Sequence, residues 1–239
     1  MQDAPHPGVP RDEAGRLTIG ILGPVEATAG GRTIGLGGSK ARALLSILVL
    51  HRNETVSTDT LIEGLWGTDA PPTAPKMLQV QVSRLRRALE PDAVLITRAP
   101  GYVLQLAPDQ VDLGRFETKV AAARGIPTIE PGRAADALRD ALGLWRGAPL
   151  SDVAAEPFAS WAIPRLEELR LAVIEERIDL ELRAGRHRHI VGELRDLVAE
   201  HPYRERFAGQ LMLALYRTGR QAEALDVFHR IRDRLADEL

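Results

Sequence analysis

The segment that most constrains the fold of this chain runs from residue 73 to residue 106. It reads TAPKMLQVQVSRLRRALEPDAVLITRAPGYVLQL. Its first half repeats apolar residues at helical spacing, which places them on one helix face: Leu78, Val82, Leu85 and Leu89. Pro91 then stops the helix, and two β-rich runs, 94–97 and 102–106, flank a turn that contains Arg98. An amphipathic helix followed by a hairpin predicts a winged helix.

Strand and helix patterns also precede this segment. Short strands are expected at residues 17–22, 25–28 and 32–36. Ser39 is the expected N-cap of a first helix, and a second helix is expected to begin at Ser57 or Thr58. The order of three strands, three helices and a closing hairpin predicts an α+β winged helix-turn-helix domain.

The second half of the chain carries helical patterns and no strand pattern. Gly185 and Gly219 lie 34 residues apart, and each is followed at the same offsets by apolar residues: Ile190 and Leu194 in one copy, Ala224 and Phe228 in the other. A period of 34 residues with these marks is that of tetratricopeptide repeats. The patterns therefore predict stacked helices, an arrangement suited to protein contacts.

The expected fold class is mainly α, with the two parts in sequence. Residues 1–15 are polar and Pro-rich, which predicts a disordered tail. Residues 16–107 form the winged-helix domain, and Pro108 interrupts the chain where the strand pattern stops. Residues 111–239 form an all-α, tetratricopeptide-like domain.

Polar and basic side chains cover the other face of the helix that precedes the hairpin. Gln79 and Ser83 can hydrogen-bond base edges, and Val80 can pack against a thymine methyl. Four cations suit phosphate or guanine: Lys76, Arg84, Arg86 and Arg87. Arg98 at the hairpin tip can enter the minor groove, and an ordinary exposed turn residue is the alternative interpretation. A solvated helix face is the alternative interpretation, and the hairpin that follows favours DNA.

The glycine-rich segment before the first helix offers a phosphate site. Residues 35–40 read GLGGSK, which departs from a nucleotide-binding P-loop because Gly-Lys-Ser/Thr closes that loop. Amides at the helix N-terminus, with Ser39 and Lys40, can instead hold a DNA backbone phosphate. A tight strand-to-helix connection is the alternative.

Charge and composition are compatible with DNA binding and give no support for an enzyme. The net charge is −2, but residues 1–108 hold 11 Lys+Arg against 10 Asp+Glu, and the remainder holds 20 against 23. There is no cysteine, His187 and His189 have no acidic partner at metal-binding spacing, and no nucleophile motif is present. We expect no catalytic residue, cofactor, metal or membrane segment, and a cytoplasmic, nucleoid-associated protein.

These segments together resemble the Streptomyces antibiotic regulatory protein family. TRAPGYVLQL after VQVSRLRRALEP is similar to the OmpR-type winged helix of that family, as are ILGPVEA, GGSKARALLSILVL and LIEGLW. From Val111 through LWRGAPL to RDRLADEL the chain resembles the family's bacterial transcriptional activation domain. The resemblance covers nearly everything from Arg16 onward.

The resemblance implies an activator that binds direct repeats in double-stranded DNA as a dimer and recruits RNA polymerase with its sigma factor. Its targets would be secondary-metabolite genes. It implies DNA contacts at Ser39, Lys40, Lys76, Gln79, Val80, Ser83, Arg84, Arg86, Arg87 and Arg98. No receiver domain precedes the winged helix, and family members usually continue past RDRLADEL, so a truncated second domain is expected. The alternative function is a tetratricopeptide-type interaction scaffold, as the N-terminal part of a larger regulator.

Overall fold

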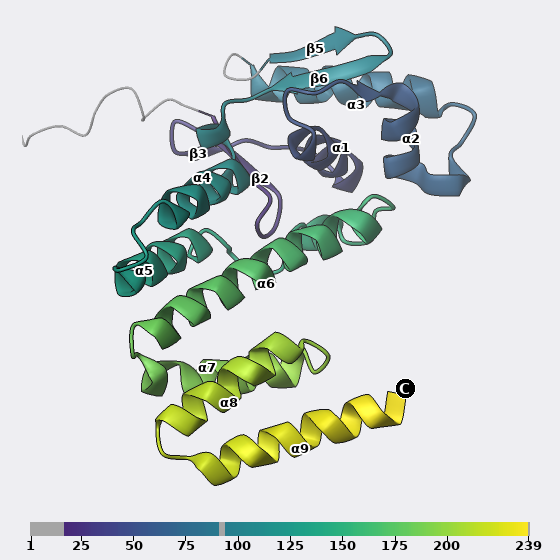
Figure 1. Cartoon of the computed structure of the whole chain (residues 1–239). Helices are drawn as coiled ribbons and strands as arrows, with labels where there is room; N and C mark the ends of the chain where they lie inside the picture. Colours follow the sequence, from purple (N-terminus) through teal and green to yellow (C-terminus); the bar gives the residue numbers. More distant parts are fainter. Residues whose placement is uncertain (1–16, 91–93, 239) are drawn as a thin grey trace, which may run out of the picture. The chain divides into compact units, whose positions relative to one another are not determined.

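The computed structural model describes residues 17–90 and 94–238 (Figure 1). The tail expected at 1–15 lies outside the described residues. The rest divides into two compact units. The first comprises the described residues up to Thr118 together with Leu144–Glu168. The second comprises Lys119–Gly143 together with the described residues from Leu169 onward.

The first unit opens with an antiparallel sheet in the order β1-β2-β3. Its strands are β1 (Thr18–Gly20), β2 (Glu26–Ala29) and β3 (Arg32–Thr33). Gly30 and Gly31 connect β2 to β3 with positive φ angles of 58° and 74°, which glycine adopts at little cost. The three strands expected from the sequence are confirmed.

Three helices follow: α1 (Ser39–Leu50), α2 (Thr58–Trp66) and α3 (Ala74–Leu89). The predicted start of the second helix is confirmed, and Ser57 is its N-cap, because Ser57 Oγ accepts a hydrogen bond from Thr60 N at 3.0 Å. The N-cap prediction was made for α1, and it is wrong by one residue. Gly38 has the extended backbone of an N-cap, so Ser39 already lies inside the helix and its hydroxyl caps nothing. A 3-10 turn, η1 (Gly67–Asp69), follows α2.

A second sheet closes the winged helix, in the order β4-β6-β5. The predicted hairpin is confirmed as β5 (Val94–Arg98) and β6 (Gly101–Gln105). The third strand, β4 (Val56–Ser57), was not predicted. Two residues are too few to show an alternating pattern, and β4 exists because β6 pairs with it, Val56 with Tyr102 and Ser57 with Gly101.

Residues beyond the winged helix complete the core of the first unit. After the 3-10 turn η2 (Pro108–Gln110), α4 (Asp112–Arg124) begins with the buried Asp112. Asp112 accepts hydrogen bonds from the amides of Ile21 and Leu22, both at 2.9 Å. Leu150 N donates to Ile21 O and Gly23 O, at 3.2 and 2.8 Å. The winged helix is therefore tied to segments far along the chain.

The regular elements of the second unit, among its described residues, are all helices, as predicted. The unit contains part of α4, α5 (Pro131–Leu142), part of α6 (Ala159–Arg183), α7 (His187–Glu200), α8 (Glu205–Arg217) and α9 (Gln221–Glu238). The short η3 (Ser151–Val153) belongs to the first unit. One apolar cluster spans α6 to α9, with Phe207, Leu211 and Leu215 at its centre.

The 34-residue period has a backbone counterpart. Gly185 ends α6 with a φ of 76°, and Gly219 ends α8 with a φ of 79°. The residue after each glycine donates its amide to a carbonyl five residues earlier, Arg186 to Glu181 and Arg220 to Leu215, both at 2.9 Å. The two copies of the repeat differ in the burial of one equivalent position, since Leu194 is fully buried whereas Phe228 is 46% exposed.

Candidate nucleic-acid interface

Helix α3 presents one buried and one exposed face. Leu78, Val82 and Leu85 are no more than 2% exposed, and α3 packs against α1, α2 and β5. The outer face carries six of the predicted site residues, all exposed: Lys76, Gln79, Val80, Ser83, Arg84 and Arg87. A long amphipathic helix with short polar side chains outward is the shape that the major groove accepts.

The polar side chains of this face are unoccupied by the protein itself. Among residues 17–90 and 94–238, no hydrogen bond or ion pair involves the side chains of Lys76, Gln79, Ser83, Arg84, Arg87 or Arg98. Val80 lies among them with 44% of its surface exposed. A phosphate oxygen can therefore bind these cations without breaking an ion pair among the described residues.

Arg86 is used differently. It is half-buried, and its Nε donates to Leu95 O at 2.8 Å while its Nη2 donates to Thr97 Oγ1 at 3.3 Å. Both acceptors belong to β5. The Arg86 guanidinium thus fastens the hairpin to α3, and a DNA contact by this residue stays a prediction that the geometry does not favour.

The hairpin tip projects as a wing. Arg98 is exposed at the end of β5 and pairs in register with Gly101 at the start of β6 (Figure 1). The first residue of α2 fixes the turn, because Thr58 N and Thr58 Oγ1 both donate to Pro100 O, at 3.2 and 3.1 Å. The same helix-turn-helix segment that carries α3 therefore positions Arg98.

Gly101 is required where β4 passes the wing. A Cβ built on Gly101 would lie 1.8 Å from Val56 O, a backbone atom that cannot move aside independently. Gly101→Ala should separate β4 from β6 and lower the free energy of unfolding by about 1–3 kcal/mol, the usual cost of overpacking. Urea unfolding followed by circular dichroism measures this loss. Gly35→Ala is the matched control, since a Cβ there meets nothing within 4 Å; equal losses in both variants would refute the steric argument.

Ser39 and Arg84 border one hollow. A cavity of about 460 Å³ lies between the N-terminal end of α1 and α3, lined by residues 35–41 with Gln81, Arg84 and Ala88. Ser39 is exposed at its edge. The N-terminal end of α1 and Arg84 therefore border a common space, and a helix N-terminus beside an arginine favours an anionic phosphate.

Lys40 lines the same hollow, but its ammonium is engaged. Lys40 Nζ lies 2.6 Å from Glu156 Oε2, also donates to Leu65 O, and sits 5.8 Å from the centre of the Trp66 ring. Glu156 is 9% exposed, so the ion pair is shielded from water. A phosphate contact by Lys40 would have to break this pair, and the geometry gives that prediction no support.

One exposed residue of the face was missed in the sequence. Met77 is 41% exposed and lies about one helical turn from Val80 and two turns from Arg84. The spacing of three and seven residues could have identified it, but a methionine looks like a core residue in a pattern. Its flexible thioether side chain suits contact with a thymine methyl or a sugar.

The described residues can also be compared with the requirements of a metal site and of a membrane-spanning helix. In residues 17–90 and 94–238 no group of three His, Cys, Asp or Glu side chains is arranged to hold a metal ion. No helix in that part of the chain has both the length and the apolar character needed to cross a bilayer.

The fold and the exposed face of α3 define a winged-helix transcriptional regulator. Comparisons with known proteins agree. Residues 32–104 match the family described as "Transcriptional regulatory protein, C terminal", and residues 111–239 match the "Bacterial transcriptional activator domain". The chain belongs to the Streptomyces antibiotic regulatory protein family of transcriptional regulators.

Several curated relatives share most of this sequence. Regulatory protein AfsR of Streptomyces coelicolor is 43% identical over 238 residues, which is 98% of this chain and 24% of that protein. Regulatory protein DnrI of Streptomyces peucetius is 36% identical over 93% of this chain and 86% of its own length. The chain thus spans about a quarter of the AfsR proteins and most of DnrI.

A solved structure has the same fold. Mycobacterium tuberculosis EmbR, determined in complex with a low-affinity phosphopeptide, superposes with a TM-score of 0.88 and 34% sequence identity. The match covers 94% of this chain and 61% of that one. The winged helix followed by the helical domain is therefore the shared architecture of these regulators.

Proposed function

We propose that this chain is a transcriptional activator that reads direct repeats in double-stranded DNA through α3 and the wing. The observation that carries the proposal is the row of exposed polar and basic side chains on α3, continued by Arg98, for which the described residues hold no partner. Gln79, Val80 and Ser83 at the centre of the row would contact bases. Lys76 and Arg87 towards its ends would contact phosphates.

A further phosphate contact is proposed at the N-terminal end of α1. Ser39, the first turn of the helix and Arg84 border the cavity described above. A backbone phosphate there would fix the register of α3 in the major groove without reading sequence. Lys40 and Arg86 are left out of the proposed interface because Glu156 and β5 engage them.

Two protomers on tandem half-sites would place one α3 in each of two successive major grooves. Half-sites about 10–11 base pairs apart satisfy this geometry. Membership of the family supports recruitment of RNA polymerase with its sigma factor, and control of antibiotic biosynthesis genes, as the outcome of binding. The helical unit would supply the protein contacts, since stacked helices present extended surfaces.

Selection from a random duplex pool tests the proposal. The purified chain, at physiological salt, should enrich tandem copies of one short motif spaced by one helical turn. The same selection with Lys76→Glu and Arg87→Glu combined should enrich nothing. A folded chain that enriches no motif, or a double variant that enriches the same motif, would remove α3 from DNA recognition.

A protein-interaction scaffold is the second candidate. The observation that favours it is an apolar hollow on the outer side of α8 and α9, bordered by Leu213, Tyr216, Leu225 and Phe228, which are 38–64% exposed. Salt distinguishes the two functions. DNA binding through phosphates weakens steeply as salt rises, whereas an apolar contact does not.

A further inference from the structure

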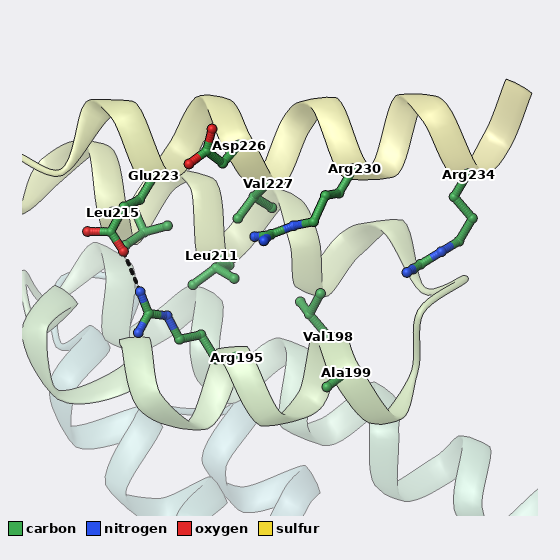
Figure 2. Close-up of a pocket in the computed structure, with 10 residues that line it drawn as sticks. All are labelled: Arg195, Val198, Ala199, Leu211, Leu215, Glu223, Asp226, Val227, Arg230 and Arg234. Carbon is green, nitrogen blue, oxygen red and sulfur yellow. Dashed lines mark hydrogen bonds and ion pairs between the residues drawn. The ribbon is translucent and has the colours of Figure 1, made fainter.

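A groove of about 420 Å³ runs between α7 and α9 in the second unit (Figure 2). Helix α8 forms its floor, α7 one wall and α9 the other. All of its lining residues belong to the same compact unit. The groove is separate from the winged helix and has no part in the DNA contacts proposed above.

The floor of the groove is apolar. Leu211 and Leu215 of α8 and Val227 of α9 are 1–3% exposed, and the partly buried Val198 of α7 packs against the same cluster. The side chains of Leu211, Leu215 and Val227 are almost fully covered, so the partly buried Val198 and the exposed Ala199 supply most of the apolar surface that a ligand side chain can reach.

Arginines stand on both walls. Arg195 projects from α7, and Arg230 and Arg234 from α9 (Figure 2). Within the described part of the chain, no hydrogen bond or ion pair involves Arg230, which is exposed and extends from α9 towards the space above Val198. Arg234 donates to Pro202 O at 2.8 Å and lies 6.0 Å from the Tyr203 ring, which fixes its position.

The groove's two acids cancel only part of this charge, since three arginines and two acids line it. Glu223 is paired with Arg195 and also receives two hydrogen bonds from Arg220, at 2.7 and 2.6 Å. Hydrogen bonding by Arg220, with the charge of Arg195, lowers the pKa of Glu223. Asp226 is exposed, lines the groove from α9 and, among the described residues, has no arginine partner.

We infer that this groove binds an acidic peptide segment of a partner protein, with one bulky apolar side chain against Val198 and Ala199 and a carboxylate on Arg230. Charge complementarity selects this occupant. Arg230 is an unsatisfied cation beside an apolar surface, and Arg234 is held within the same groove to receive a second carboxylate. The outer hollow between α8 and α9 has no charged lining residue, so it offers nothing that would favour an acidic peptide over a neutral one.

Binding of a defined probe to the whole chain tests the inference. The probe is a fluorescein-labelled peptide of Asp, Glu, Leu and Phe, and fluorescence anisotropy gives its Kd. The wild-type chain should bind it, and Arg230→Glu should weaken binding about tenfold or more, since a charge-assisted contact becomes a repulsion. A probe of the same charge in which Leu and Phe are replaced by Ser should bind about as weakly as the variant does.

Arg232→Glu is the matched control. Arg232 is exposed on the same helix, pairs with Asp233 and does not line the groove. It makes the same change in net charge, so it should leave the Kd unchanged. In the ¹⁵N-labelled chain, the amides of Val198, Ala199 and Val227 should shift on titration with the probe. Absence of binding to the wild-type chain, equal weakening by both variants, or shifts confined to the outer hollow would each overturn the inference.

Discussion

Replacing Asp112 by alanine should lower the free energy of unfolding of the first unit by about 3–5 kcal/mol. This is the usual cost of removing one partner from a buried, hydrogen-bonded charge. Asp112 is 2% exposed. Its carboxylate accepts the amides of Ile21, Leu22 and Leu113, and Arg146 Nη2 lies 3.4 Å from Oδ2. Alanine would leave these amides buried without an acceptor, and the Arg146 guanidinium without its buried counter-ion.

Urea unfolding followed by tryptophan fluorescence measures this loss, because Trp145 packs edge-on against Phe116, 5.6 Å between ring centres, in the same α4 region. Asp112→Asn keeps one acceptor oxygen and should cost less than alanine. Asp69→Ala is the control, since Asp69 lies in the same unit, is exposed and, among the described residues, is unpaired. The same comparison with Asp140→Ala, in the second unit, shows whether the loss is confined to the first. If Asp112→Ala and Asp69→Ala differ by less than about 0.5 kcal/mol, the carboxylate does not anchor this unit.

DNA binding should separate the residues of α3 into two groups. Lys76→Ala and Arg87→Ala should weaken binding to every sequence, roughly tenfold each, and reduce the slope of log Kd against log salt by about one. Gln79→Ala and Ser83→Ala should instead relax preference at single base positions, at about 1–3 kcal/mol for a lost base contact. Fluorescence anisotropy with selected and scrambled duplexes, over a range of salt concentrations, distinguishes these outcomes.

Arg165→Ala is the control for both groups. Arg165 is exposed on α6 within the first unit, and no described residue pairs with it. Its removal changes the net charge by the same amount as Arg87→Ala but should leave affinity and salt slope unchanged. If Arg165→Ala and Arg87→Ala reduce affinity equally, binding depends on net charge and not on the face of α3.

The elements of the winged helix that have a local pattern were predictable. The apolar stripe of α3, the hairpin that follows and the start of α2 at Thr58 each depend on residues within a few positions of one another, and all three are confirmed. The exposure of Lys76, Gln79 and Arg87 follows from the same stripe, because helical geometry places them opposite Leu78 and Leu85.

The elements that depend on distant partners were not predictable. Lys40 looks like a phosphate ligand until Glu156, 116 residues away, folds against it. Arg86 resembles its neighbours in sequence, and only the position of β5 assigns it to Leu95 O. Asp112 looks like an ordinary acid in the first turn of a helix, since nothing in its neighbourhood shows that Ile21 and Leu22 will donate to it.

Leu150 N donates to Ile21 O and Gly23 O, and Phe158 N donates to Gly64 O at 3.0 Å. These hydrogen bonds limit where two such regulators can be cut and joined to exchange their DNA-binding parts. A chimera joined at Pro108, where the strand pattern of the sequence ends, would divide the first folded unit. The winged helix would then lose Asp112, Leu150 and Phe158, all nearly or fully buried, and expose its own apolar interior. The transferable module is therefore longer than the part that reads DNA: a functional exchange between relatives must carry residues 108–118 and 144–168 with the winged helix.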